Sequence, residues 1–157
     1  MSNRAEVRAR ISRNNVVSLP AEPASERKHG RPLLEDPLFS ARLAQVEIEL
    51  MALEITNLRF LDQMRRTNQP PGADVSMLKI KGTELQQAAT EILMEVAGVN
   101  AMAFQSDHLW GTATEESIGP EWAATVAPDY FYTRASSIYG GSNEIQRNIV
   151  AQMTIGL

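Results

Sequence analysis

The amino-acid sequence predicts an all-α fold in which four helices form an antiparallel up-and-down four-helix bundle. Two long segments, residues 37–66 and 73–97, repeat apolar side chains at spacings of three and four residues. That spacing places the apolar side chains along one face of a helix. Two shorter helical segments follow, residues 129–137 and a last helix that begins after Ser142. A chain of 157 residues is long enough to bury a core of this kind.

We divide the chain into residues 1–33, an N-terminal helix with an irregular linker, and residues 34–157, the helical bundle domain. Val7 and Ile11 lie four residues apart, on one face of a short helix that we expect over residues 4–14. Pro20 and Pro23 indicate a loop over residues 16–31.

The longest helix should start at Asp36-Pro37, which combines an acidic N-cap with proline at the first helical position. One row of apolar residues runs along it, broken once by Asn57, and comprises Phe39, Leu43, Val46, Leu50, Leu53, Phe60 and Met64. A second row lies beside the first and comprises Ile48, Met51, Ile55 and Leu58. We therefore expect this helix to be buried on more than one side. It should end near Arg66, because the prolines that follow cannot continue it.

The second long helix also has one apolar row, which comprises Val75, Leu78, Gly82, Leu85, Ala89, Ile92 and Val96. The small side chains of Gly82 and Ala89 permit close approach of a neighbouring helix, and Gly98 is a plausible stop. Residues 99–127 give no clear periodicity. In residues 129–137, we expect Phe131 and Arg134 to lie on functional faces.

Composition excludes several classes of function. The net charge of −4 argues against a nucleic-acid partner, and the absence of cysteine excludes a disulfide scaffold, a thiolate nucleophile and a cysteine zinc site. His29 and His108 lack the spacing of metal ligands, so we expect no metal site. No apolar run approaches the roughly 20 residues that span a bilayer, and no secretory signal is visible. We expect a cytoplasmic protein without a membrane partner.

The most informative sequence lies near the C-terminus, in Ser136–Ala151 (SSIYGGSNEIQRNIVA). Gly140 and Gly141 relax the backbone, Ser142 stands where a helix N-cap belongs, and Glu144 falls in the first turn. The pattern indicates a glycine-rich corner that opens an amphipathic helix, with free backbone N–H groups able to bind an anion. An ordinary capped helix after a tight turn explains the same residues without a ligand.

This string closely resembles the C-terminal signature of acyl-CoA dehydrogenases, flavoenzymes that introduce an α,β double bond into acyl-CoA thioesters. The resemblance extends from about Glu26 to Leu157 and implies the all-helical C-terminal domain of the family, without its N-terminal helical domain and β-domain. It also implies FAD as cofactor, acyl-CoA as substrate, and assembly as a homo-oligomer or as a heteromer with a flavin-domain polypeptide.

The resemblance assigns roles to particular residues. Gly140, Gly141 and Ser142 form the corner against the flavin and the thioester, and Ser142 and Glu144 hold the adenosine-phosphate end of FAD. Many members have a glutamate base where this chain has Gly140, so we assign no catalytic residue.

The resemblance also covers two earlier segments. Arg27 opens a segment similar to the family's Arg-x-x-Phe-Gly-x-Pro-Leu, in which the arginine reaches the FAD pyrophosphate of a neighbouring subunit. Here that segment is one residue shorter, with His29 near the expected phenylalanine. At the end of the second long helix, Met94 and Ala97 replace a glutamine and a glycine that contact the dinucleotide in the family. We therefore interpret this segment as a helix end and not as a cofactor contact.

Two main hypotheses follow. The chain is the C-terminal domain of an acyl-CoA dehydrogenase-like flavoprotein and is inactive when isolated. Alternatively, it is a non-catalytic helical subunit or pseudoenzyme remnant that packs with a full-length relative. A plain four-helix bundle that resembles the family by chance is the third alternative.

Overall fold

A computed structural model of the chain describes residues 27–28, 30–69 and 72–156. Its strands and α-helices are β1 (Arg27–Lys28), β2 (Arg31–Pro32), α2 (Pro37–Thr67), α3 (Asp74–Ala97), α4 (Ser106–Leu109), α5 (Val126–Thr133) and α6 (Asn143–Ile155). Four 3-10 turns connect them: η1 (Leu33–Glu35), η2 (Gly98–Met102), η3 (Glu121–Thr125) and η4 (Arg134–Ser137). The all-α prediction is confirmed. The helix expected over residues 4–14 lies outside the described residues.

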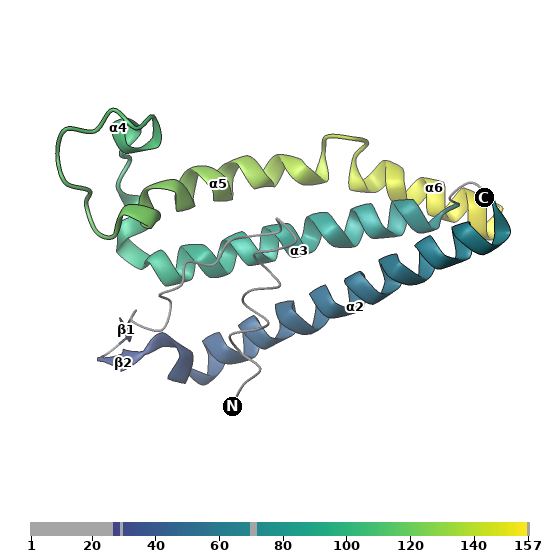
Figure 1. The fold of residues 1–157 in the computed structure, drawn as a ribbon, viewed down its shortest axis with the longest axis horizontal. Coiled ribbons are helices and arrows are strands. Elements are labelled where there is room, and N and C mark those ends of the chain that lie inside the picture. Colours follow the sequence, from purple (N-terminus) through teal and green to yellow (C-terminus); the bar gives the residue numbers. More distant parts are fainter. Residues whose placement is uncertain (1–26, 29, 70–71, 157) are drawn as a thin grey trace.

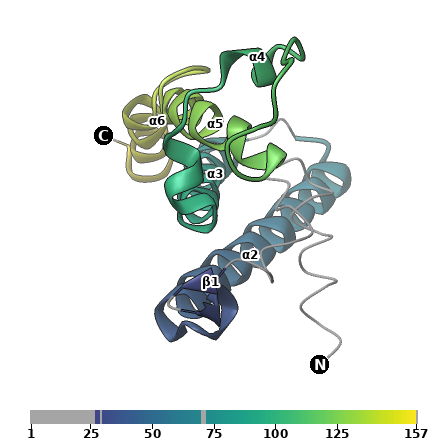
Figure 2. The same cartoon turned by 90° about the vertical axis from the view of Figure 1, so that its left-hand side faces the viewer.

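Helix α3 occupies the centre of the molecule (Figures 1 and 2). Helix α2 runs antiparallel to α3 on one side, while α5 and α6 follow one another along another face of α3 (Figure 1). Helices α5 and α6 therefore lie end to end along α3, and the glycine corner lies between them. Both α5 and α6 pack chiefly on α3 rather than on α2.

The ends of the long helices match the sequence prediction closely. The Leu38 N–H donates to the Asp36 carboxylate at 3.0 Å, so Asp36 is the N-cap of α2. That helix ends at Asn68, whose φ of 51° lies in the left-handed region. Helix α3 ends before Gly98, which has a φ of 53°. Local capping chemistry is sufficient to set these boundaries.

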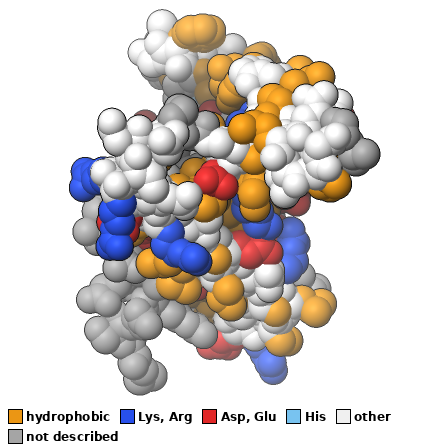
Figure 3. All heavy atoms as spheres, turned by 90° about the vertical axis from the view of Figure 1, so that its right-hand side faces the viewer, with side chains coloured by type: hydrophobic (Ala, Val, Ile, Leu, Met, Phe, Trp, Pro, Cys, Tyr) orange, Lys and Arg blue, Asp and Glu red, His pale blue; other side chains and the backbone are white. Residues whose placement is uncertain are grey.

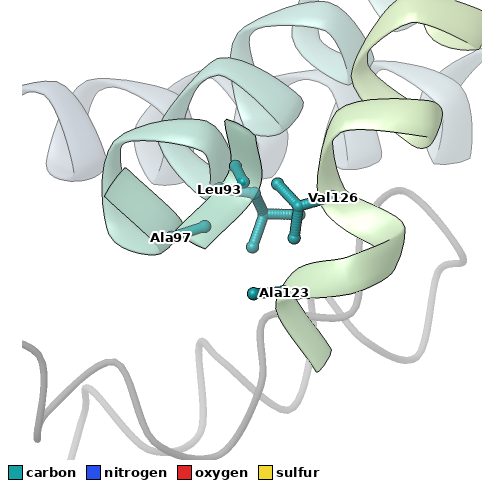
Figure 4. Packing of buried hydrophobic residues seen from close by; sticks show 5 residues of the cluster. Leu93, Ala97, Ala123 and Val126 are labelled. Carbon is teal, nitrogen blue, oxygen red and sulfur yellow. The ribbon is translucent and has the colours of Figure 1, made fainter. Parts of the chain in front are cut away.

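Two hydrophobic clusters form the core where α3 ends. One comprises Leu93, Ala97, Ala101, Ala123 and Val126, four of which are labelled in Figure 4. The other comprises Leu33, Phe39, Ile92 and Val96 and joins α3 to the start of α2. The partly buried Trp122 packs against both clusters, so it connects the α5 side of the core to the α2 side.

The prediction that α2 is buried on a second side is wrong for this chain. Ile48, Ile55 and Leu58 are each more than half exposed. The physical reason is the arrangement of the helices: α3 covers the first apolar row of α2, and α5 and α6 pack on α3 instead of covering the second. Exposed hydrophobic side chains also lie beside basic ones at the end of the molecule that Figure 3 shows.

The described helices include none with the length and apolar character needed to cross a membrane.

Candidate functional site

The glycine corner between α5 and α6 depends on two left-handed residues. Gly140 has a φ of 67° and Gly141 a φ of 86°, and both are exposed. A Cβ atom at Gly140 would have no neighbour within 4 Å, whereas one at Gly141 would lie 2.7 Å from Nε2 of Gln146. Gln146 Nε2 also donates to the Gly140 carbonyl at 3.4 Å. The Gln146 side chain thus lies across Gly141 and leaves the space over Gly140 open.

Backbone donors gather where this corner meets α6. Ser142 is the N-cap, because its hydroxyl oxygen accepts from the Ile145 N–H at 3.4 Å. Among the described residues, the N–H groups of Gly140, Gly141 and Ser142 have no acceptor. Together with the positive end of the helix dipole, these donors favour an anion.

The Glu144 carboxylate lies at the same helix end. Its own backbone N–H lowers the pKa of Glu144, and the Ser142 hydroxyl and the charges of Arg147 and Lys79 lower it further. Arg147 lies 3.8 Å from this carboxylate and forms a 3.0 Å ion pair with Glu84 of α3. Glu144 is therefore ionised at neutral pH and competes with an external anion for the donors of the corner.

Asn143 fixes the corner to α3. This side chain is only 5% exposed. Its Oδ1 accepts from Lys79 Nζ at 2.8 Å, and its Nδ2 donates to Thr83 Oγ1 at 3.1 Å. The sequence analysis missed this contact. Lys79 and Thr83 stand four residues apart on one helix face, but nothing in the local pattern identifies Asn143 as their partner.

Arg134 anchors the residues just before the corner. Its Nη2 donates to the Gln87 carbonyl at 2.9 Å and to Thr90 Oγ1 at 2.8 Å, and its Nη1 lies 3.1 Å from Glu91. Its guanidinium also lies 4.4 Å from the centre of the Tyr130 ring. Although we expected Arg134 on a functional face, the structure uses it to hold α5 and η4 against α3.

The other residues implied by the family resemblance lie away from the corner. Arg27 belongs to β1, which pairs with β2 at the far end of the molecule from the connection between α5 and α6 (Figure 1). One chain therefore does not bring Arg27 and the glycine corner together. Met94 and Ala97 lie in the last turn of α3, so the interpretation of that segment as a helix end is confirmed.

Two further hollows contain no constellation of catalytic side chains. One, of about 320 Å³, lies between α2 and α3 and has an apolar floor that includes Val46, Leu85 and Ile92. Ion pairs between neighbouring helices border it, among them Glu49 with Lys81. The other lies beside α4 and includes His108 and Glu115. Across the described ranges, no three His, Asp or Glu side chains are placed to hold a metal ion.

Comparisons with known proteins agree on one family. The model for the C-terminal domain of acyl-CoA dehydrogenases matches residues 4–155. Acyl-CoA dehydrogenase IpdE1 of Mycolicibacterium smegmatis is 32% identical over 123 residues, which cover 78% of this chain and 26% of that protein. Acyl-CoA dehydrogenase FadE26 of Mycobacterium tuberculosis is 28% identical over 130 residues, which cover 82% of this chain and 30% of that protein.

Solved structures have the same fold. The ChsE4-ChsE5 complex from Mycobacterium tuberculosis matches with a TM-score of 0.62 and 26% identity, covering 85% of this chain and 32% of that one. The Tcur3481-Tcur3483 steroid ACAD matches with a TM-score of 0.60 over 98% of this chain and 33% of that one; its 22% identity supports the fold alone.

The chain thus spans about a quarter to a third of the length of these relatives. Because the family model matches nearly all of it, the chain belongs to the acyl-CoA dehydrogenase family and corresponds to the family's C-terminal domain.

Proposed function

We propose that this helical domain forms one wall of the active site of an acyl-CoA dehydrogenase and acts together with the flavin and β-domains of such an enzyme. The reaction is the FAD-dependent α,β-dehydrogenation of acyl-CoA thioesters. The observation that carries the proposal is the exposed corner at Gly140, Gly141 and Ser142, whose N–H groups at the start of α6 have no acceptor in the part of the chain that the structure describes.

The donor set of this corner fits the phosphates of FAD. Three backbone N–H groups and the Ser142 hydroxyl can donate to phosphate oxygens, and the absence of a side chain at Gly140 leaves room for their approach. When bound, FAD supplies the acceptor for the hydride that leaves the β-carbon. The charge of Glu144 opposes a phosphate here, although its backbone N–H lies at the same helix end. Affinity for FAD should therefore be weaker than the donors alone suggest.

The corner supplies no base for the proton at the α-carbon. Gly140 occupies the position at which the family resemblance places a glutamate, and glycine has no carboxylate. A carboxylate from another part of the assembly has to remove that proton. We therefore propose that the isolated chain, even with FAD, catalyses no acyl-CoA-dependent reduction of a dye. Measurable turnover by the pure chain contradicts this proposal.

A complete flavin site needs more than one subunit. Arg27 and the glycine corner lie far apart in one chain (Figure 1), so they contact one FAD molecule only if each comes from a different subunit. The similarity to a chain of the solved ChsE4-ChsE5 complex supports a heteromer with a flavin-domain polypeptide as the partner. A homo-oligomer meets the same requirement. We propose a cytoplasmic location for this assembly.

A non-catalytic helical subunit is the second candidate. Met94, Ala97 and Gly140 stand where the family resemblance implies a glutamine, a glycine and a glutamate. Such a subunit would pack against a full-length relative without contacting FAD. Binding of FAD by the glycine corner therefore separates the two candidates.

The test is a fluorescence titration of FAD into the wild-type chain and two glycine variants. Gly140→Ala adds a methyl group in the open space over the corner, at a φ of 67°. Gly156→Ala adds one in similarly open space at a φ of 76°, at the other end of α6, and is the matched control for backbone strain. Saturable binding that Gly140→Ala weakens and Gly156→Ala leaves unchanged supports the proposal. No saturable binding by the wild type supports the non-catalytic subunit, and equal binding by all three chains contradicts an FAD site at the corner.

A further inference from the structure

The glycine corner is anchored on both sides, but not by its own two glycines. Before it, the N–H group of Tyr139 donates to the Ala135 carbonyl at 3.1 Å. After it, the buried Asn143 holds the start of α6 against α3. Gly140 and Gly141 lie between these anchors, are exposed and have no side chain that could fix them. Because glycine has the largest conformational freedom of all residues, this part of the corner needs a further contact to keep one conformation.

The side chain of Gln146 supplies that contact. Gln146 stands one turn after the N-cap Ser142, whose carbonyl accepts from the Gln146 N–H at 2.9 Å. Side chains on a helix tilt toward its N-terminus, so a long side chain at this position reaches back over the corner. Its Nε2 donates to the Gly140 carbonyl at 3.4 Å. Among the described residues, Gln146 is the only one that forms a hydrogen bond with Gly140 or Gly141.

Gly141 makes room for this amide. A Cβ atom at Gly141 would lie 2.7 Å from Nε2 of Gln146, which is closer than van der Waals contact permits. A side chain at this position would therefore displace the amide from the Gly140 carbonyl. At Gly140, by contrast, a Cβ atom would have no neighbour within 4 Å. The two glycines thus have different roles: Gly141 admits the amide of Gln146, whereas Gly140 leaves the space over the corner open.

We propose that Gln146 is a positioning residue for the flavin phosphates, whose amide braces Gly140 and Gly141 and so keeps their N–H groups in place as phosphate donors. The inference rests on the proposed function of the corner and names the residue that preorganises it. Donors that are ordered before binding spare a phosphate ligand the entropic cost of ordering them. Gln146 carries no charge, so it acts through the backbone that it holds and not by attracting an anion from a distance.

Titration of FAD and of ADP into the full chain tests this role. Gln146→Met removes the donor and keeps a side chain of similar length and helix propensity. It should raise both dissociation constants about two- to tenfold, the loss expected for one neutral hydrogen bond. Gln146→Asn, whose amide is too short to reach the Gly140 carbonyl, should give the same loss. Gln152→Met is the matched control, because Gln152 is exposed on α6 and its side chain forms no hydrogen bond with another described residue.

Two readouts separate positioning from a merely structural role. The hydrogen bond of Gln146 is exposed, so Gln146→Met should leave the midpoint of thermal unfolding within about 2 °C of the wild type. In the chain without FAD, the NMR order parameters of the Gly140 and Gly141 amides should fall from about 0.85 to below about 0.6 in this variant. The order parameter of Ile149, in the middle of α6, should stay unchanged.

The outcomes distinguish this inference from the proposed function. If the wild type binds FAD and ADP and Gln146→Met binds them equally well, the positioning role is overturned and the proposed function stands. Order parameters of the two glycines that do not change, or an equal loss of affinity in Gln152→Met, also overturn the positioning role alone. A wild-type chain that binds neither FAD nor ADP refutes the proposed function and the positioning role together.

Discussion

Replacing Asn143 by alanine tests whether one buried amide positions the glycine corner. Asn143 accepts from Lys79 at 2.8 Å and donates to Thr83 at 3.1 Å. A hydrogen bond with a charged partner contributes about 1.5–3 kcal/mol, and a neutral one about 0.5–1.5 kcal/mol. The half-buried Lys79 regains some hydration in the variant, which places the expected loss near the lower end. We expect the free energy of unfolding to fall by about 2–3 kcal/mol.

For a chain of this length, such a loss lowers the midpoint of thermal unfolding by about 4–12 °C. Circular dichroism followed through thermal and urea unfolding measures it. Asn148→Ala is the matched control, because Asn148 is an exposed asparagine on the same helix whose side chain forms no hydrogen bond with another described residue. That variant should be as stable as the wild type or slightly more so, since alanine favours helix. If Asn143→Ala unfolds within about 0.5 kcal/mol of the wild type, or if both variants lose equal stability, the anchoring role of Asn143 is refuted.

Three further predictions concern stability. Arg134→Ala should lower the free energy of unfolding in urea by about 2–3 kcal/mol, because the guanidinium donates to a carbonyl and a hydroxyl of α3. Arg42→Ala, which breaks an exposed ion pair, should lower it by less than about 1 kcal/mol, and equal losses contradict the argument. Gly141→Ala should destabilise the chain by about 1–2 kcal/mol, because a side chain is strained at the φ of 86° that this residue adopts. Gly82→Ala should stabilise the chain by about 0.5–1 kcal/mol, because alanine favours helix and the new Cβ would lie at an ordinary 3.9 Å from Leu53. Thermal midpoints of the two variants that move in the same direction would falsify this. The fold lowers the pKa of Glu144 below that of a free glutamate, chiefly through the residue's own backbone N–H. Its contribution to stability is therefore present above the pKa of the unfolded chain and is lost as the pH falls through the lower, folded-state pKa. Glu144→Gln should lower the thermal midpoint at neutral pH, with the difference from wild type closing in acid, and a constant difference excludes this linkage.

The ends of the helices could be predicted because local chemistry determines them. A capping or helix-ending residue acts on backbone hydrogen bonds within a few residues of itself, so its position in the sequence predicts a helix end. Asp36 with Pro37 marks the start of α2, Gly98 the end of α3 and Ser142 the start of α6. The start of α5 was less visible. It begins at Val126, three residues before the expected position, with Pro128 in its first turn, where proline interrupts no helical hydrogen bond.

The packing of the helices could not be predicted from periodicity. The row that includes Ile48 and Ile55 indicates that something covers it, but the pattern is the same whether the cover is this chain or another. Likewise, the contacts of Asn143 with Lys79 and of Arg134 with Thr90 join residues that are distant in sequence. Such pairs depend on how α6 and α5 approach α3, which no local pattern encodes. The roles of Arg27 and the glycine corner in FAD binding stay predictions.

The most direct test of the central claim is whether ADP displaces FAD from the pure chain. The corner at Gly140, Gly141 and Ser142 offers donors to phosphate and nothing that selects the flavin ring. ADP should therefore compete fully with FAD in a fluorescence titration, and riboflavin, which lacks phosphate, should not. Absence of saturable FAD binding, or displacement by riboflavin but not by ADP, would contradict a flavin-phosphate site at this corner.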